Sequence, residues 1–327
     1  MCCLYFVLPC YNEEAVLPLT NQRLLLKVEQ LIQSGQISPV SKIVYVNDGS
    51  KDQTWQLIQR YSRESALVAG IDLSRNRGHQ NALLAGLMTV KDAADAVISM
   101  DADLQDDLNA VDEMLARFKQ GIDVVYGVRS SRQQDTFAKR FTAELFYKFM
   151  NLLGAHTVFN HADFRLMSQK ALNGLAEFKE VNIFLRGLVP LVGYSADYVY
   201  YERKERAAGT SKYTLSKMLG LAVDGITSMS IRPIRLIGLV GFFSLLVSLV
   251  MLIYSFVQHA AGNTQPGWTS LMISIWFLGG LNLLSLGVVG EYVGKTYLES
   301  KHRPRFLINR STGLDPDPQP AAGPAET

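Results

Sequence analysis

The sequence is poor in cysteine and lacks the marks of a secreted chain. Only three cysteines occur among 327 residues, Cys2, Cys3 and Cys10, all close to the N-terminus. They form no even set for pairing and no metal-ligand spacing, so a disulfide-stapled fold is excluded and a reducing compartment is indicated. The first residues also lack the basic start, the long apolar stretch and the small-residue cleavage site of a signal peptide. We therefore expect the polar part of the chain to remain in the cytosol.

The chain also lacks any G-x-G triplet and any large excess of charge. Without that glycine pattern the dinucleotide-binding fingerprint is absent, which excludes a conventional dehydrogenase or epimerase. A formal net charge of +2 over 327 residues is too small to indicate a nucleic-acid partner. The basic residues that are present gather locally, beside two apolar stretches.

Charged residues are missing altogether from those two stretches, residues 236–257 and 271–289. A helix over the first would be roughly 33 Å long, enough to cross a hydrocarbon core of about 30 Å. The loop between them has no Lys or Arg, whereas both outer flanks are basic, so the positive-inside rule places both flanks in the cytoplasm. A buried hairpin in a soluble core is the alternative, but two uncharged runs of about 20 residues are rare there. The flanking cations are Arg232, Arg235, Lys295, Lys301, Arg303 and Arg305.

The part of the chain before these stretches alternates between two kinds of segment. Short apolar, β-branched runs are separated by polar or helix-patterned stretches. This alternation is typical of an α/β fold with a mostly parallel sheet. The runs cover residues 4–8, 42–46, 67–73, 96–100 and 123–128.

A polar cluster follows each of the first four runs: PCYNEE, NDGSKD, SRNRGHQ and DADLQD. In open parallel sheets ligands bind at the carboxyl ends of the strands, so we expect these clusters to meet. Each cluster alone is interpreted equally well as a turn or a helix cap. Polar clusters at four successive strand ends, three of them rich in acids, favour one shared site.

Two segments have the pattern of amphipathic helices. Apolar residues recur at about every fourth position over residues 136–153 and again over 214–230, with Lys and Arg nearby. Packing on the sheet is the commoner fate of such a helix, but the aromatic content and basic neighbours favour helices that lie in the membrane interface.

Three parts of the chain are therefore predicted. Residues 1–230 form a cytoplasmic catalytic domain that includes both interface helices, and residues 231–300 form a two-helix transmembrane anchor. Residues 301–327 form a cytoplasmic tail that is largely disordered, because after Asn309 it is rich in proline and small residues.

The order and spacing of the polar clusters resemble one enzyme family. LPCYNEE, VNDGSKD, SRNRGHQNALLAGL, MDADLQD, DFRLMS and ERKERAAGTSKY, followed by two apolar stretches, are similar to the family 2 inverting glycosyltransferases. Within that family they resemble the polyprenyl-phosphate glycosyltransferases, the group of bactoprenol glucosyltransferase and dolichyl-phosphate mannose synthase. The resemblance runs from Leu4 to about Lys301. It implies a GT-A fold, a nucleotide-diphosphate sugar donor, Mg²⁺ or Mn²⁺, and undecaprenyl phosphate as acceptor at the bacterial inner membrane.

The resemblance also implies roles for particular residues around the donor. Asp103 and Gln105 match the D-x-D-x-Q element and would ligate the metal, since Mg²⁺ and Mn²⁺ prefer oxygen ligands. Asp101 would contact the nucleotide or the outer shell of the metal; an acid at a helix N-terminus is its alternative interpretation. The residues that match nucleotide-sugar contacts are Pro9, Tyr11, Glu13, Asp48 and Asp101.

The expected catalytic set is Asp101, Asp163 and Arg165. Asp163, in DFRLMS, matches a carboxylate that often acts as a base in relatives. A phosphate monoester has its second pKa near 6, so most of the acceptor is already a dianion at neutral pH and needs no strong base. Asp163 would then orient the acceptor or a sugar hydroxyl, and a buried ion pair with Arg165 is the alternative.

An anionic acceptor requires cations near the transferred sugar. Several candidates stand in ERKERAAGTSKY, a Gly- and Ser-containing segment that is expected to close over the diphosphate; a solvated basic loop is the alternative. The candidates for the acceptor phosphate or the diphosphate are Arg129, Arg140, Arg203, Arg206 and Lys212.

Two other functions fit parts of this pattern. A processive polysaccharide synthase shares the D-x-D region, but resembles a group with a Q-x-x-R-W motif and more spans, and the sequence has neither. A non-catalytic membrane scaffold would keep the fold, yet DADLQ and DFR favour turnover. We expect an enzyme that transfers glucose, N-acetylglucosamine or a similar hexose, with UDP as the favoured carrier. Association with membrane lipid and assembly as a homo-oligomer complete the prediction.

Overall fold

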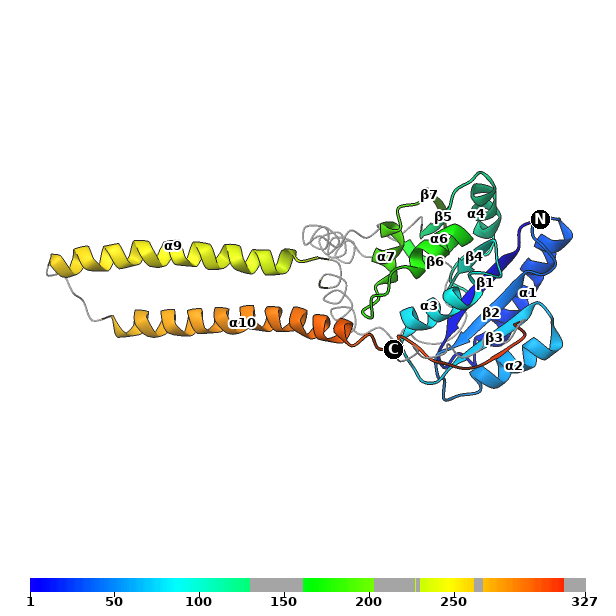
Figure 1. Cartoon of the computed structure of the whole chain (residues 1–327), viewed down its shortest axis with the longest axis horizontal. Helices are drawn as coiled ribbons and strands as arrows, with labels where there is room; N and C mark the ends of the chain where they lie inside the picture. The colour runs from blue at the N-terminus through cyan, green and yellow to red at the C-terminus, as the bar shows by residue number, and fades with distance from the viewer. Residues whose placement is uncertain (130–160, 203–226, 228–229, 262–266, 315–327) are drawn as a thin grey trace, which may run out of the picture. The chain divides into compact units, whose positions relative to one another are not determined.

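The computed structural model describes residues 1–129, 161–202, 227, 230–261 and 267–314. The chain divides into two compact units. One unit is an α/β domain built on a single mixed sheet, and the other contains two long helices (Figure 1). We describe each unit by itself.

The strands of the α/β domain lie in the order β7-β5-β6-β4-β1-β2-β3-β8. They are β1 (Leu4–Cys10), β2 (Lys42–Asn47), β3 (Val68–Leu73), β4 (Ala96–Ser99), β5 (Val124–Arg129), β6 (His161–Ser168), β7 (Ala196–Tyr201) and β8 (Ile308–Thr312). The four strands β3, β2, β1 and β4 are parallel, whereas β6 runs antiparallel between β4 and β5. The five predicted strands are confirmed, and with them the α/β fold class.

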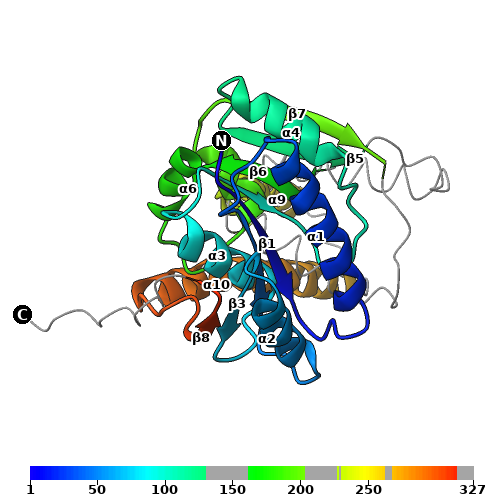
Figure 2. The ribbon, with the colours of Figure 1, turned by 90° about the vertical axis from the view of Figure 1, so that its right-hand side faces the viewer.

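Helices cover both faces of this sheet (Figure 2). They are α1 (Leu17–Gln33), α2 (Thr54–Glu64), α3 (His79–Val90), α4 (Ala110–Lys119), α6 (Gln169–Ala176) and α7 (Leu185–Leu191). The apolar sides of α1, α2 and α4 share one buried core with Phe6 and Leu8 of β1. Val7 points to the opposite face, because side chains alternate along a strand, and there it meets α3. A Cβ on Gly86 of α3 would lie 2.4 Å from Val7 Cγ1, so glycine allows the helix to approach β1 closely.

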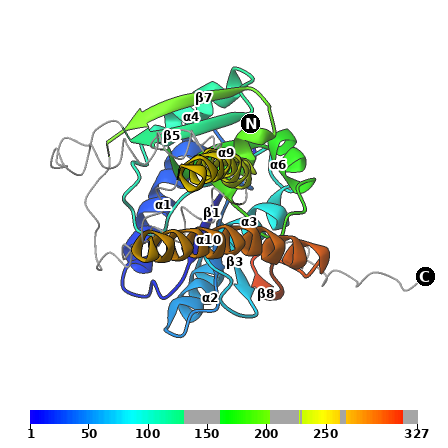
Figure 3. The same cartoon turned by 90° about the vertical axis from the view of Figure 1, so that its left-hand side faces the viewer.

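β8 corrects the prediction of a disordered tail. Residues 308–312 pair antiparallel with β3 at the edge of the sheet (Figures 2 and 3), so the prediction is wrong for this part of 301–327. The side chain of Arg310 donates from Nε to Asp72 Oδ2 at 2.9 Å, and Asn309 Nδ2 donates to the same oxygen at 3.2 Å. Backbone pairing and these polar contacts stabilise a strand that has no apolar pattern, which is why hydropathy did not predict it. Residues 315–327 lie outside the described residues.

The second unit contains α9 (Arg232–Ala260) and α10 (Trp268–Ser300). Both predicted apolar stretches are helical, and both helices are long and apolar enough to cross a membrane. The most apolar windows have mean hydropathies of 2.3 and 1.3, and none of either window is buried. Large exposed side chains such as Leu236, Phe242 and Val250 leave the helices with an apolar surface, unlike the buried hairpin of a soluble core. The predicted interface helix 136–153 lies outside the described residues, and so does 214–230 except for Thr227 and Ser230.

Candidate active site

The loops that follow β1 and β2 are tied together by hydrogen bonds. The backbone N–H of Asn12 donates to Ser50 Oγ at 3.0 Å, and the N–H of Glu13 donates to Thr54 Oγ1 at 2.9 Å. Asn12 has a left-handed backbone with φ at 52°, which lets the first loop turn sharply. The predicted nucleotide residues on this loop therefore share one surface with the β2 loop. Pro9 is buried in β1, Glu13 is half-buried and Tyr11 is 37% exposed.

Asp48 connects the β2 loop to the loop before α3. Its carboxylate is 2% exposed and accepts from the backbone N–H of Arg77 at 2.6 Å and of Gly78 at 2.9 Å. Burial raises the pKa of Asp48 above its ordinary value, although these two N–H groups oppose the rise. Gly49 must be glycine here, since a Cβ on it would lie 2.5 Å from Asn76 N. Asp48 thus shapes the SRNRGHQ loop, and its direct contact with a nucleotide stays a prediction.

The D-x-D-x-Q element follows β4 and presents alternate residues to opposite sides. Leu104 has φ at 56°, an unfavourable value for a leucine, and such strain is held in place only by the surrounding structure. Thr20 Oγ1 of α1 holds the loop by donating to Ala102 O at 2.7 Å. The partly exposed residues are Asp101, Asp103 and Gln105, and the buried ones are Ala102, Leu104 and Asp106. The predicted metal ligands therefore lie on the accessible side of the loop.

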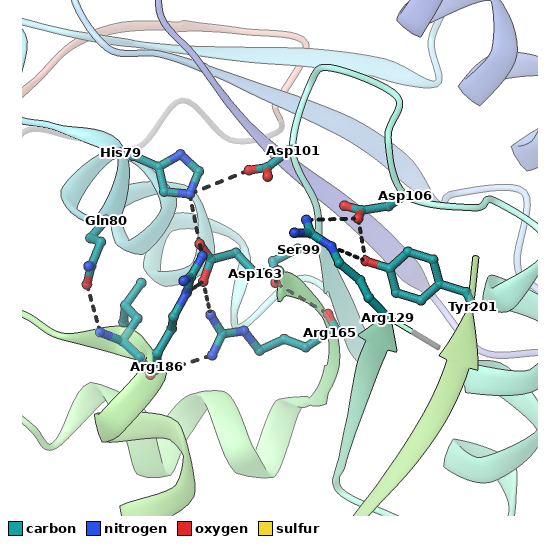
Figure 4. A network of polar contacts seen from close by, with 11 residues as sticks. His79, Gln80, Ser99, Asp101, Asp106, Arg129, Asp163, Arg165, Arg186 and Tyr201 are labelled. Atoms are coloured by element: carbon teal, nitrogen blue, oxygen red, sulfur yellow. Dashed lines mark hydrogen bonds and ion pairs between the residues drawn. The ribbon is translucent and has the colours of Figure 1, made fainter. Parts of the chain in front are cut away.

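Asp163 lies at the centre of a cationic cluster (Figure 4). Arg165 Nη2 donates to its Oδ1 at 2.8 Å, Arg186 Nη2 donates to its Oδ2 at 3.1 Å, and His79 Nε2 is 3.2 Å from the same Oδ2. Burial alone would raise the pKa of Asp163, but the Arg186 charge, the His79 contact and the Arg165 charge outweigh burial and hold it well below its ordinary value. Asp163 is therefore a permanent anion and a poor proton acceptor at neutral pH.

Arg165 lies in the interior beside Asp163. Arg165 is 1% exposed and forms the buried ion pair with Asp163 that was the alternative interpretation, so it cannot reach a substrate in this structure. Ser99 Oγ of β4 donates to Asp163 O at 2.6 Å and so fastens this end of β6 to its neighbour. The ion pair is suited to hold Asp163 in position, and a catalytic role of Arg165 stays a prediction.

Sequence reasoning missed His79 and Arg186. His79 is the first residue of α3, and its Nε2 also lies 3.6 Å from Asp101 Oδ1. Burial would lower the pKa of His79, but the contact with Asp163 and the charge of Asp101 raise it. His79 belongs to the SRNRGHQ cluster, which the sequence placed near the site without singling out the histidine. Arg186 stands in an apolar run, FLRGLVPL, and nothing in that run indicated a functional residue.

A second polar cluster, formed by Asp106, Tyr201 and Arg129, lies on the other side of Asp101 (Figure 4). Tyr201 OH donates to Asp106 Oδ1 at 2.5 Å, and Arg129 Nη2 lies 3.7 Å from the same oxygen. Burial first and the charge of Asp101 second raise the pKa of Asp106 to about 6. Arg129 therefore lies beside the D-x-D-x-Q loop, and its contact with a phosphate stays a prediction. Four other predicted cations, Arg140, Arg203, Arg206 and Lys212, lie outside the described residues.

The D-x-D-x-Q region fits a divalent cation by its chemistry. Asp101, Asp103 and Asp106 repel one another, since the charges of the first two raise the pKa of the third. Asp106 Oδ2 is buried and has no hydrogen-bond partner among the residues that the structure describes. Those residues contain no group of three or more His, Cys, Asp and Glu side chains arranged to hold a metal. Mg²⁺ ordinarily takes one or two carboxylates and completes its shell with water and phosphate oxygens.

Two family models match the chain. Residues 5–175 match the glycosyl transferase family 2 model, and residues 232–296 match the GtrB C-terminal hairpin model. The first match contains all of the described candidate site except Arg186 and Tyr201, and the second covers α9 and most of α10.

Relatives align over nearly the whole chain. The uncharacterized glycosyltransferase YkoT of Bacillus subtilis (strain 168) is 49% identical over 94% of this chain and 91% of its own length. The bactoprenol glucosyl transferase of Shigella phage SfV is 38% identical over 92% of this chain and 96% of its own length. Among solved structures, glucosyl-3-phosphoglycerate synthase from Mycobacterium tuberculosis, in complex with Mn²⁺, UDP-glucose and phosphoglyceric acid, aligns with a TM-score of 0.45 at 16% identity. That alignment covers 71% of this chain and 79% of the synthase chain.

Proposed function

The chain belongs to glycosyl transferase family 2, and from this premise we propose that it transfers a hexose from a nucleotide-diphosphate sugar to undecaprenyl phosphate. UDP-glucose is the first candidate donor. The supporting observation is that the likeness to a bactoprenol glucosyl transferase extends over 92% of the chain, through both the α/β domain and the two long helices.

The donor occupies the carboxyl ends of β1, β2 and β4 in this proposal. The joined loops after β1 and β2 receive the nucleoside, with Tyr11 and Glu13 on their surface. Asp103 and Gln105 would hold Mg²⁺ or Mn²⁺. When bound, the metal neutralises the negative charge that develops on the departing diphosphate.

The acceptor phosphate attacks the anomeric carbon from the face opposite the diphosphate, so the configuration at that carbon is inverted. A bond forms between a phosphate oxygen and the anomeric carbon, and the bond from that carbon to the diphosphate breaks, with its electron pair leaving on the diphosphate. No proton has to move, because the acceptor is already largely a dianion above its second pKa of about 6. Asp163, held ionised by two guanidinium groups, is suited to orient its neighbours and not to accept a proton.

The long helices give the reaction its location. We propose that α9 and α10 cross the bacterial inner membrane and that both termini and the site are cytoplasmic, because the cations flank the uncharged stretches 236–257 and 271–289 on their outer sides. A cytoplasmic site has access to nucleotide sugars and to the phosphate of a membrane-bound polyprenol. Association of several copies stays a prediction.

A transfer assay tests the proposal. The protein, purified in detergent, is incubated with undecaprenyl phosphate, Mg²⁺ and, in turn, UDP-glucose, UDP-N-acetylglucosamine and GDP-mannose, and the lipid is analysed by mass spectrometry. One donor is expected to give a glycosylated lipid phosphate that disappears with EDTA and with Asp103→Ala. Folded protein that binds UDP but gives no lipid product with any donor contradicts the proposal and favours the scaffold.

A further inference from the structure

We propose that Arg186 and His79 form the subsite that binds the phosphate of the acceptor lipid. This inference rests on the proposed function and goes beyond it, because none of the cations expected from the sequence for that phosphate is Arg186 or His79. Both side chains come from helices that begin at the site, α7 and α3 (Figure 4). They approach each other because both contact one carboxylate oxygen, Asp163 Oδ2.

The site has a buried layer beneath an accessible one. Asp163 and Arg165 form the buried layer, with 8% and 1% of their side-chain surface exposed. Arg186, His79 and Asp101 form the accessible layer, with 37%, 36% and 34% exposed. The buried pair holds the accessible cations from below and leaves part of their surface open to a ligand.

The charges of the cluster favour an anion on the Arg186 side. Asp163 faces two guanidinium groups, those of Arg165 and Arg186, and only Arg186 is partly exposed. Asp101, 3.6 Å from His79 Nε2, repels a phosphate and so limits it to the Arg186 side of the imidazole. His79 also opens α3, whose N-terminal end carries partial positive charge that favours anions. An arginine offers a planar fork of donors that matches the oxygens of a phosphate.

The strand order favours the acceptor over the donor as the source of that phosphate. β6, which carries Asp163, lies on the side of β4 away from β1 and β2, where the nucleoside is proposed to bind. The D-x-D-x-Q loop after β4 lies between these two regions. An inverting transfer requires the acceptor to approach from the side opposite the diphosphate, so a cationic pair beyond Asp101 suits the attacking phosphate.

Steady-state kinetics with the full-length protein test the assignment. Arg186→Ala is expected to raise the KM for undecaprenyl phosphate by about 10- to 100-fold, the effect of losing a charge-assisted contact, and to leave the KM for the nucleotide sugar within about twofold. Arg186→Lys keeps the positive charge but loses the planar fork of donors. Its KM for undecaprenyl phosphate should therefore fall between those of the wild type and Arg186→Ala. Arg60→Ala is the matched control, because Arg60 pairs with Glu64 on the exposed surface of α2.

The outcomes separate this inference from the proposed function. Wild-type protein that glycosylates no lipid contradicts the proposed function itself. Active wild-type protein whose Arg186→Ala and Arg186→Lys variants keep the acceptor KM, or change the donor KM equally, overturns only the phosphate subsite. If Arg186→Ala does not fold, the Arg186→Lys kinetics decide.

Direct binding provides a readout that does not depend on turnover. In isothermal titration, farnesyl phosphate is expected to bind the wild type and Arg60→Ala with equal affinity. It should bind Arg186→Ala and His79→Ala more weakly. Farnesol, which lacks the phosphate, is expected to bind all four proteins weakly. Equal binding of farnesyl phosphate to the wild type and Arg186→Ala would overturn the assignment.

Discussion

Asp163 and Asp106 lie at the same end of one sheet, are 6% and 3% exposed, and have opposite electrostatic surroundings. Asp163 contacts two guanidinium groups and an imidazole, and its pKa is held well below the ordinary value. Asp106 receives one phenol hydrogen bond and a guanidinium at 3.7 Å, close to two other acids, and its pKa rises to about 6. Burial raises the pKa of both carboxyl groups, so the difference comes from their neighbours.

The two aspartates are suited to different roles in the site. Asp163 is an anion whose charge is already matched, so it can position Arg165, Arg186 and His79 permanently. Asp106 carries a charge that its surroundings do not match, so a cation bound at the D-x-D-x-Q loop would stabilise the ionised form. The cluster around Asp163 is therefore preorganised by the protein itself. The region around Asp106 would be completed by a cation bound at the D-x-D-x-Q loop.

Removing the buried partner of Asp163 should have the largest effect on stability. Arg165→Met leaves the buried carboxylate without its closest guanidinium, and the free energy of unfolding should fall by about 3 kcal/mol or more, as when other buried pairs are broken. Urea unfolding followed by circular dichroism measures the loss. A fall of less than about 1 kcal/mol would mean that Arg186 and His79 alone satisfy Asp163.

Isosteric amides at the two aspartates compare them directly. Asp163→Asn should lower the free energy of unfolding by about 3 kcal/mol at pH 7, because Arg165 then stays buried without an anion. Asp106→Asn should not lower the free energy of unfolding at pH 7, because the amide oxygen still accepts from Tyr201 while a poorly matched buried charge is removed. The free energies of unfolding are measured in EDTA. Equal losses for Asp163→Asn and Asp106→Asn would contradict the proposed difference between the two carboxylates.

The pH dependence of these variants sharpens the comparison further. Asp106 has a folded pKa of about 6 and an ordinary value of 3.8, so the folded state binds the proton more tightly and loses stability as pH rises from about 4 to 6. Metal-free wild type should therefore lose up to about 3 kcal/mol relative to Asp106→Asn across this window. For Asp163 the folded pKa lies below 3.8, so its contribution is complete above about pH 5 and is lost as pH falls below 4. Urea unfolding at intervals from pH 3.5 to 8 measures both curves, and parallel curves for the two variants would contradict this prediction.

The smallest effect is expected at an exposed ion pair. Arg310 of β8 is 54% exposed where it bonds to the buried carboxylate of Asp72, so solvent weakens the interaction relative to the Arg165 pair. Arg310→Ala should lower the free energy of unfolding by about 0.5–1 kcal/mol, measured by urea unfolding beside Arg60→Ala. A loss as large as that of Arg165→Met would show that β8 contributes far more than its surface pair.

The sequence predicted the first five strands because most of their residues are apolar, as in strands buried on both faces. It also predicted the accessible acids, because polar residues at the ends of parallel strands meet at one edge. It could not predict Arg186, a single cation in an apolar helix whose partner is distant in sequence. Nor could it predict β8, because Asn309, Arg310 and Ser311 form a strand through backbone pairing and not through an apolar pattern.

The acceptor of the sugar tests the central claim most directly. Vesicles that contain the protein with either undecaprenyl phosphate or undecaprenol receive Mg²⁺ and radiolabelled UDP-glucose, or the donor that the transfer assay selects, and label in the extracted lipid is counted. The account predicts label in the lipid phosphate and none in the alcohol, with the signal lost in Asp103→Ala and reduced in Arg186→Ala. Equal labelling of both lipids, or label in neither while UDP is released, would contradict it.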